Sequence, residues 1–180
     1  MHVDWNNWEP NMRAVLLFVQ QADRVLLIRK KTGLGKGKIN GPGGKLDPGE
    51  TPVEAAVREV NEELHIRVEP GDCEEMGVLR FQFVDGLALH CVVFRSPRFE
   101  GTPTETPEAT PMWHPVDQIP FEEMWEDDRY WLGGMLLGRK FRGDFVFDEE
   151  RMLEKRVEWF SVQEFESSGL EDFRPEPLNP

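Results

Sequence analysis

Three glutamates and an arginine stand close together in the middle of the chain. They are Arg58, Glu59, Glu62 and Glu63. Residues three or four apart are neighbours on a helix surface, so a helix here would crowd the three carboxylates onto one face. A divalent cation relieves their repulsion, because hard cations such as Mg²⁺ prefer carboxylate oxygen and bring phosphate groups with them. The pattern therefore predicts metal-assisted chemistry on a phosphorylated substrate.

A helix from about residue 52 to 64 is expected to position these side chains. Thr51 and Glu54 have the spacing of a capping box, and Pro52 suits the first helical position. The buried face would be an apolar stripe at helical spacing, made of Val53, Val57, Val60 and Leu64. A solvated acidic surface helix is the alternative for an isolated E-x-x-E-E pattern. The glycines that precede this helix favour the functional interpretation.

The longer segment from Gly44 to Ile66 reads GKLDPGETPVEAAVREVNEELHI. It resembles the Nudix box, G-x5-E-x7-R-E-U-x-E-E-x-G-U, in which U is an aliphatic residue. Every fixed position matches except His65, which stands where the family has glycine. A left-handed residue commonly ends a helix at such a position, and a residue other than glycine costs about 1 kcal/mol there. The departure concerns the loop after the helix more than the chemistry.

The resemblance implies a role for each matched carboxylate. Glu59, Glu62 and Glu63 would bind Mg²⁺, with Mn²⁺ as a substitute, and the backbone carbonyl of Gly43 would be a further ligand. One of the three glutamates would also orient or deprotonate the attacking water. Glu59 is the first choice for this base, but the base varies within the family and the assignment stays open.

Two residues support this group. Arg58 is placed to pair with Glu50 or Glu62 and to hold them, and the alternative for it is a plain surface ion pair. Glu108 lies well after the box, and many Nudix proteins recruit a distant carboxylate to the metal. The alternative for Glu108 is a solvated loop acid.

Further segments resemble one branch of the Nudix family, the animal-type MutT homologues. They are KINGPGGK at 38–45, GTPTETPE at 101–108, DQIPFEEMWEDDRYW at 117–131 and FRGDFVF at 141–147. The resemblance covers about residues 13–159. It implies Mg²⁺-dependent hydrolysis of oxidised purine nucleoside triphosphates, such as 8-oxo-dGTP and 2-hydroxy-dATP, to the monophosphate and pyrophosphate. This activity would sanitise the nucleotide pool.

The residue types in these segments suit a purine, which is a flat apolar ring with polar edges. Trp125 offers a stacking face, and Asn40 offers both a donor and an acceptor. Asp127 and Asp128 are adjacent carboxylates. If both entered one dry pocket, one would carry a proton at neutral pH, so the pair would both donate and accept hydrogen bonds. The alternative is an acidic helix start beside a half-buried tryptophan.

Other residues complete the expected substrate site. Lys30 and Lys45 are expected beside the phosphates, and the remaining members are Gly44, Leu34 and Phe81. Leu34 replaces an aromatic residue of the branch, Ile39 replaces a tryptophan, and Val15 replaces a small hydroxyl residue. The preferred base therefore stays open among 8-oxo-guanine, 2-hydroxyadenine and methylated purines.

Two other functions remain open. One is a Nudix hydrolase of a different substrate, such as a methylated purine nucleotide, a dinucleoside polyphosphate or a nucleotide sugar. The other is a catalytically silent nucleotide sensor, but such proteins would be expected to lose the box carboxylates, which this chain keeps.

The composition limits the partners. The chain has 180 residues and a net charge of −13, from 34 acidic and 21 basic side chains. This charge argues against binding to polymeric nucleic acid or a membrane surface, which need clustered lysine and arginine. We expect a small-molecule nucleotide as the partner. The oligomeric state stays open, with a monomer favoured.

The cysteines and the start of the chain indicate a compartment. Cys73 and Cys91 form no C-x-x-C pair, which favours two reduced structural thiols. The first residues lack the order of a signal peptide, and no apolar run approaches the length of a membrane span. We expect a cytoplasmic location.

The elements predict an α/β class, as an α/β/α sandwich with a mixed β-sheet, which is the Nudix fold. The expected strands are 14–19 and 24–29, paired as a hairpin, then 77–84, 87–94, 113–116, 141–147 and 153–160. Residues 32–44 are expected as a loop and 131–137 as a helix. We expect an N-terminal arm (1–12), a catalytic domain (13–160) and a partly disordered extension (161–180), in which Ser161 caps a short helix and 175–180 is disordered.

Overall fold

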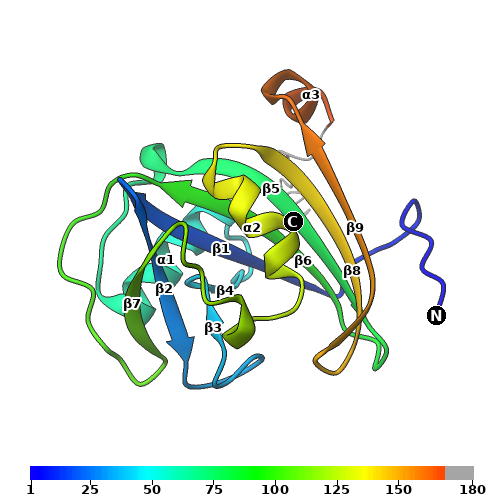
Figure 1. Cartoon of the computed structure of the whole chain (residues 1–180), viewed down its shortest axis with the longest axis horizontal. Coiled ribbons are helices and arrows are strands. Elements are labelled where there is room, and N and C mark those ends of the chain that lie inside the picture. The colour runs from blue at the N-terminus through cyan, green and yellow to red at the C-terminus, as the bar shows by residue number, and fades with distance from the viewer. Residues whose placement is uncertain (169–180) are drawn as a thin grey trace.

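The computed structural model describes residues 1–168, which form a mixed β-sheet with helices on both faces (Figure 1). The strands are β1 (Met12–Gln21), β2 (Arg24–Lys30), β3 (Ile39–Asn40), β4 (Gly43–Lys45), β5 (Glu74–Phe83), β6 (Ala88–Ser96), β7 (Ala109–Pro115), β8 (Lys140–Asp148) and β9 (Arg151–Phe160). The α-helices are α1 (Pro52–Leu64), α2 (Asp128–Leu136) and α3 (Val162–Ser167). Short 3₁₀ helices span Pro70–Asp72 and Phe121–Glu123. The expected α/β class and mixed sheet are confirmed.

The sheet has the order β3-β2-β1-β6-β5-β8-β9, with β4 beside β1 and β7 beside β2. The β1–β6 and β5–β8 pairs are parallel, and the other pairs are antiparallel. Helix α2, in yellow, lies in front of the strands in Figure 1, and α1, in cyan, lies behind them. The two helices therefore cover opposite faces.

The expected hairpin of β1 and β2 forms only beside its turn. Gln20 pairs with Val25 and Gln21 with Arg24, and the strands then diverge. The earlier part of β1 pairs with β4 and β6, whereas β2 pairs with β3 and β7. The predicted hairpin is therefore confirmed at its turn. Farther from the turn each strand pairs with other strands, and the divergence opens a wedge between β1 and β2.

Four other boundaries differ from the sequence prediction. The expected loop 32–44 contains β3 and the start of β4, which are short and depend on pairing with β2 and β1. Strand β7 begins at Ala109 rather than at 113, and α2 begins at Asp128 rather than at 131. Strand β1 begins at Met12, one residue inside the expected arm.

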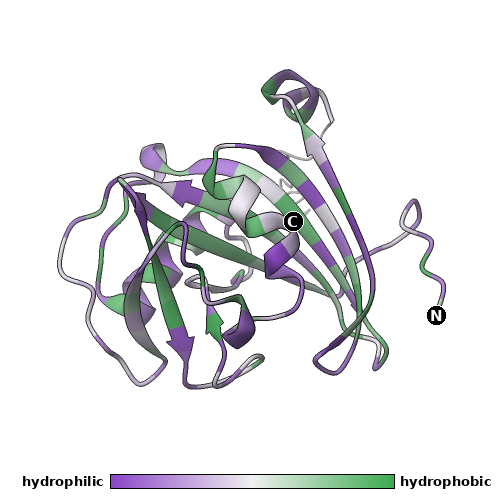
Figure 2. Ribbon diagram, viewed as in Figure 1, coloured by the Kyte–Doolittle hydropathy of each residue, from purple (hydrophilic) through white to green (hydrophobic). Residues whose placement is uncertain are grey.

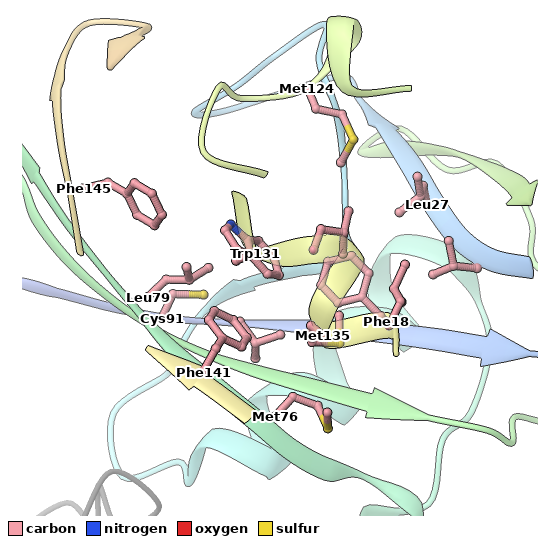
Figure 3. Close-up of a cluster of buried hydrophobic side chains, with 14 of the residues drawn as sticks. Phe18, Leu27, Met76, Leu79, Cys91, Met124, Trp131, Met135, Phe141 and Phe145 are labelled. Carbon is pink, nitrogen blue, oxygen red and sulfur yellow. The ribbon is translucent and has the colours of Figure 1, made fainter. Parts of the chain in front are cut away.

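Two buried clusters flank the sheet. The first lies between the sheet and α2, where Trp131 stacks on Phe141 with ring centroids 5.1 Å apart and packs near Leu79 (Figure 3). The second lies between the sheet and α1 and includes Ala56 and Val60 of that helix. Hydrophobic and hydrophilic bands alternate along the long strands in Figure 2, as expected of strands with two different faces. The clusters fix the strands that carry the site.

Helix α1 has the predicted ends. The Thr51 hydroxyl accepts a hydrogen bond from the Glu54 N–H, and the Glu54 carboxylate accepts one from the Thr51 N–H, which completes the capping box. His65 ends the helix in the left-handed region, with φ 57° and ψ 32°. The position therefore keeps the backbone that a glycine would favour, although histidine occupies it.

The C-terminal extension is described only in part. Ser161 caps α3 through a capping box with Glu164, as expected, and Phe165 is fully buried. The segment 175–180, which we expected to be disordered, lies outside the described residues. Among residues 1–168, no helix is long and apolar enough to cross a membrane.

A row of ionisable residues crosses the sheet. Its members pair directly from strand to strand, in the order Arg13, His90, Arg80, Asp144 and Arg156. The Arg80 guanidinium donates two hydrogen bonds to the Asp144 carboxylate, at 2.7 and 2.8 Å. Burial, and then the neighbouring guanidiniums of Arg13 and Arg80, lower the pKa of His90 to about 4. His90 is thus held neutral.

Replacing His90 with glutamine is expected to make the fold less sensitive to acid. A folded-state pKa below the unfolded value means that the unfolded chain binds the proton more readily. The stability from neutral His90 is complete above pH 6.5 and is lost as the pH falls toward 4, by about 2 kcal/mol between pH 7 and 5. Urea unfolding at both pH values measures this. An equal loss of unfolding free energy between pH 7 and 5 in the wild type and in His90→Gln would contradict the lowered pKa of His90.

Candidate functional site

Two glycines of β4 allow close approaches that a side chain would block, one to α1 and one to β1. A Cβ on Gly44 would lie 2.4 Å from the carboxyl carbon of Glu59, and one on Gly43 would lie 1.9 Å from the carbonyl oxygen of Val15. The Gly43 N–H donates a hydrogen bond of 3.2 Å to the Glu63 carboxylate. Gly44 therefore leaves the space that the Glu59 carboxylate occupies, and Gly43 lets β4 lie against β1 with its N–H directed at Glu63.

Glu59, Glu63 and Glu108 form one acidic group, in which a carboxylate oxygen of each lies within 4.8 Å of the others. Glu63 is buried, Glu59 is partly buried and Glu108 is exposed. Burial, which outweighs the Gly43 hydrogen bond, raises the pKa of Glu63 to about 8, and burial also raises the pKa of Glu59. A cation at this group would favour the ionised carboxylates, and the all-oxygen donor set suits Mg²⁺.

Of the four glutamates predicted as metal ligands, the structure brings all but Glu62 into this group. The Glu62 side chain is 50% exposed and pairs with Arg58 at 3.2 Å, one helical turn away. Its position follows from the helix geometry, which turns residue 62 farther from the β4 strand than residue 63. Glu108 directly precedes β7, which begins at Ala109 and pairs with β2. This pairing brings Glu108 into the group.

Arg58 holds Glu59 of the group and the neighbouring Glu50 and Glu62. Its guanidinium donates two hydrogen bonds to Glu50, at 2.7 and 2.8 Å, and one to Glu59 at 2.8 Å. It also donates to Glu62 and to the Lys45 carbonyl oxygen. The predicted pairing with Glu50 or Glu62 is confirmed, and Arg58 makes both. The hydrogen bonds from Arg58 lower the pKa of Glu50 and hold this carboxylate ionised.

A cavity of about 330 Å³ lies in the wedge beside the acidic group. All of the predicted substrate-binding residues line it, together with Gly43: Asn40, Trp125, Asp127, Asp128, Lys30, Lys45, Gly44, Leu34 and Phe81. The volume is at the lower end of the range for small-molecule sites. The predicted substrate-binding residues therefore meet in one cavity, which reaches the acidic group through Gly43 and its hydrogen bond to Glu63.

The wall of the cavity also contains apolar residues that we did not predict. Most come from alternate positions of β1, β5 and β6, and Leu87 lies directly before β6. The set includes Met12, Ala14, Leu16, Leu79, Phe83, Leu87, Leu89 and Cys91. Phe81 was the one member of β5 that we predicted. The period-two alternation in β5 and β6 is the signal that identifies such a face, but it does not say which face meets a ligand.

The polar floor of the cavity is buried. Asp127 is 2% exposed and Asp128 7%, and Asp127 accepts a hydrogen bond of 2.9 Å from Trp131 Nε1. Burial raises the pKa of Asp127 and raises that of Asp128 well above its usual value, helped by the charge of Asp127. Asn40 Nδ2 is buried and has no hydrogen-bond partner among residues 1–168. These groups are arranged to meet a polar edge of a ligand.

Trp125 forms one side of the cavity. Its ring packs edge-on against Phe83 and Phe147, with centroids 6.2 and 5.4 Å away. A Cβ on Gly35 would lie 2.7 Å from Trp125 Nε1, so the β2–β3 loop lies directly against the indole. The arrangement leaves a fixed aromatic wall beside the aspartates, which suits a flat ring.

Known proteins resemble the chain in sequence and in fold. The chain is 42% identical over 136 residues to the oxidized purine nucleoside triphosphate hydrolase of Mus musculus, and 43% identical over 133 residues to the protein of that name from Danio rerio. The alignments cover 75% and 73% of this chain and 86% and 84% of these relatives. The structure resembles a MutT protein from Bacillus halodurans, with a TM-score of 0.71 and 26% identity over 82% of this chain and 97% of that one.

The sequence pattern of the NUDIX domain matches residues 10–133. This range contains the acidic group and most of the cavity wall, so the match covers the site as well as the fold. The chain therefore belongs to the Nudix hydrolase family.

Proposed function

We propose that the chain hydrolyses oxidised purine (deoxy)nucleoside triphosphates, such as 8-oxo-dGTP and 2-hydroxy-dATP, to the monophosphate and pyrophosphate. The observation that carries the proposal is a cavity lined both by a buried aspartate pair and by Gly43, whose N–H donates a hydrogen bond to Glu63 of the acidic group. The names of the relatives in mouse and zebrafish support the same substrate class. The activity would remove damaged nucleotides from the pool.

Mg²⁺ is the cofactor that we propose, with Mn²⁺ as a substitute. Glu59, Glu63 and Glu108 would hold it with the Gly43 carbonyl, and Glu62 stays a proposed further ligand. When bound, the metal would neutralise the phosphate charge and favour deprotonation of a water molecule.

The residues of the chain would then position the reaction. Glu59 is the proposed base, since its carboxylate belongs to the acidic group while Arg58 fixes its direction at 2.8 Å. Lys30 and Lys45 line the cavity and would pair with phosphate oxygens. Phosphoryl chemistry depends mostly on such positioning and charge neutralisation.

The aspartate pair would recognise the base. Two buried carboxylates side by side retain a proton at neutral pH, because burial penalises a second charge. One carboxyl would donate a hydrogen bond and the other would accept one. Asn40 would meet another edge of the purine, and Trp125 would stack on its face.

We also propose that residues 13–160 form the catalytic domain and that the protein acts in the cytoplasm as a monomer on small nucleotides. Other Nudix substrates remain the alternative, namely methylated purine nucleotides, dinucleoside polyphosphates and nucleotide sugars. A silent nucleotide sensor is disfavoured because Glu59 and Glu63 remain and meet Glu108.

A substrate panel tests this proposal. It compares 8-oxo-dGTP, 2-hydroxy-dATP, O6-methyl-dGTP, dGTP, ADP-ribose and diadenosine polyphosphates in the presence of Mg²⁺. We expect release of pyrophosphate, with the highest kcat/KM for an oxidised purine. The highest kcat/KM for ADP-ribose or a dinucleoside polyphosphate would favour the alternative, and saturable binding without turnover would favour the sensor.

A further inference from the structure

Lys38 lies next to the substrate cavity but does not line it. It ends the β2–β3 loop, directly before β3. Its Nζ lies 5.4 Å from the centroid of the Trp125 ring and 3.2 Å from the Glu150 carboxylate. Its side chain is 23% exposed. One ammonium therefore contacts the aromatic wall of the cavity and the turn between β8 and β9.

The backbone around Lys38 is well fixed. Its carbonyl oxygen accepts a hydrogen bond from the Lys30 N–H at 3.0 Å, and its N–H donates to the Gly35 carbonyl oxygen at 2.9 Å. The same loop presses Gly35 against Trp125 Nε1. These contacts fix the backbone of the loop, so the Lys38 side chain extends from a fixed position beside the indole.

Trp125 depends on such contacts because it lies outside regular structure. It falls between the 3₁₀ helix at Phe121–Glu123 and α2, where no strand or helix fixes its backbone. Its neighbour Glu126 is tied to the same β8–β9 segment, since its carboxylate accepts a hydrogen bond from the Met152 N–H at 3.3 Å. Two polar links therefore join the Trp125 segment and the β2–β3 loop to the β8–β9 hairpin.

We propose that Lys38 is a positioning residue for base binding, which holds the Trp125 indole through a cation–π contact while Glu150 holds Lys38. The inference rests on the proposed function, because Trp125 is the stacking wall for the base. The charge of Lys38 also acts at a distance on Asp128, in the floor of the cavity. Although burial raises the pKa of Asp128, the Lys38 charge partly offsets this effect.

The first test is Lys38→Met, which removes the charge and keeps most of the stem. We expect KM for the best substrate to rise about three- to ten-fold, the size of a partly exposed cation–π contact, with kcat little changed. Stacking on the base is equal in the ground state and the transition state, so its loss appears in KM. Lys38→Arg should restore KM, because arginine also makes cation–π contacts.

Lys36→Met is the matched control, since Lys36 lies in the same loop and forms no ion pair among residues 1–168. Glu150→Gln should raise KM less than Lys38→Met, and the double variant should equal Lys38→Met alone. A KM for Lys38→Met equal to that of Lys36→Met would overturn the proposal. So would a fall in kcat alone, or a failure of Lys38→Arg to restore KM.

Binding of a neutral nucleoside distinguishes two roles for Lys38, which are positioning of Trp125 and electrostatic attraction of the substrate phosphates. The Kd of 8-oxo-2′-deoxyguanosine, measured by calorimetry, should rise by the same factor in Lys38→Met. An unchanged Kd would mean that Lys38 acts on the phosphates, and would overturn the proposal. If the wild-type protein prefers another nucleotide, the proposed function fails, and the same comparison with the nucleoside of that nucleotide still tests Lys38.

Discussion

Replacing Glu63 with glutamine is expected to lower kcat/KM by about 100- to 1000-fold, the usual effect of losing a central electrostatic group. The Glu63 carboxylate is buried, meets Glu59 and Glu108, and accepts the Gly43 N–H. The amide keeps the volume but removes the charge that a cation needs. Initial rates measured across a Mg²⁺ titration provide the test.

Two other variants make this result specific. Glu108→Gln should weaken the response to Mg²⁺ less, by about ten-fold, because Glu108 is the exposed member of the group. Glu105→Gln is the control, since Glu105 lies in the same segment but pairs with Lys31 and Thr110. If Glu63→Gln retained full activity at low Mg²⁺, the metal assignment would be refuted.

Replacing Asp127 or Asp128 with asparagine is expected to reduce the preference for oxidised over normal purines by about ten- to 100-fold. Each carboxyl is buried. After substitution, the side chain and the oxidised base no longer match as donor and acceptor, and a buried polar group is left without a partner. The change should appear in the ratio of kcat/KM for 8-oxo-dGTP to that for dGTP, while dGTP itself is less affected. Asp117→Asn is the control, because Asp117 is exposed in the segment before α2.

The pH dependence of this preference has a definite sign. Burial raises the pKa of both carboxyls, so the shared proton is kept at neutral pH and lost as the pH rises. The preference for a base that needs the carboxyl as donor should therefore decline in alkaline buffer. An unchanged preference in both asparagine variants would show that the pair does not read the base.

The helix that carries the chemistry was predictable because its signals are local. Thr51, Glu54 and Pro52 define its start, and the spacing of Arg58, Glu59 and Glu63 defines its acidic face. Helical spacing alone does not separate Glu62 from Glu63. The difference arises from β4, whose glycines bring the Gly43 N–H to Glu63 and not to Glu62.

The rest of the site depends on contacts between distant segments. Strand β3 has two residues, and β4 has three, of which two are glycine, so no periodic pattern marks them. Their form comes from pairing with β2 and β1. The divergence of β1 from β2 has the same origin, and it creates the wedge in which the cavity lies. The contact of Lys38 with Trp125 likewise needs the folded loop.

The most direct measurement of the central claim is the ratio of kcat/KM for 8-oxo-dGTP to that for dGTP with Mg²⁺, with the products identified. We predict pyrophosphate and the monophosphate as products and a ratio of about ten or more, the discrimination that a buried hydrogen-bonding pair supplies. A ratio of one or below, or release of orthophosphate instead of pyrophosphate, would contradict the account.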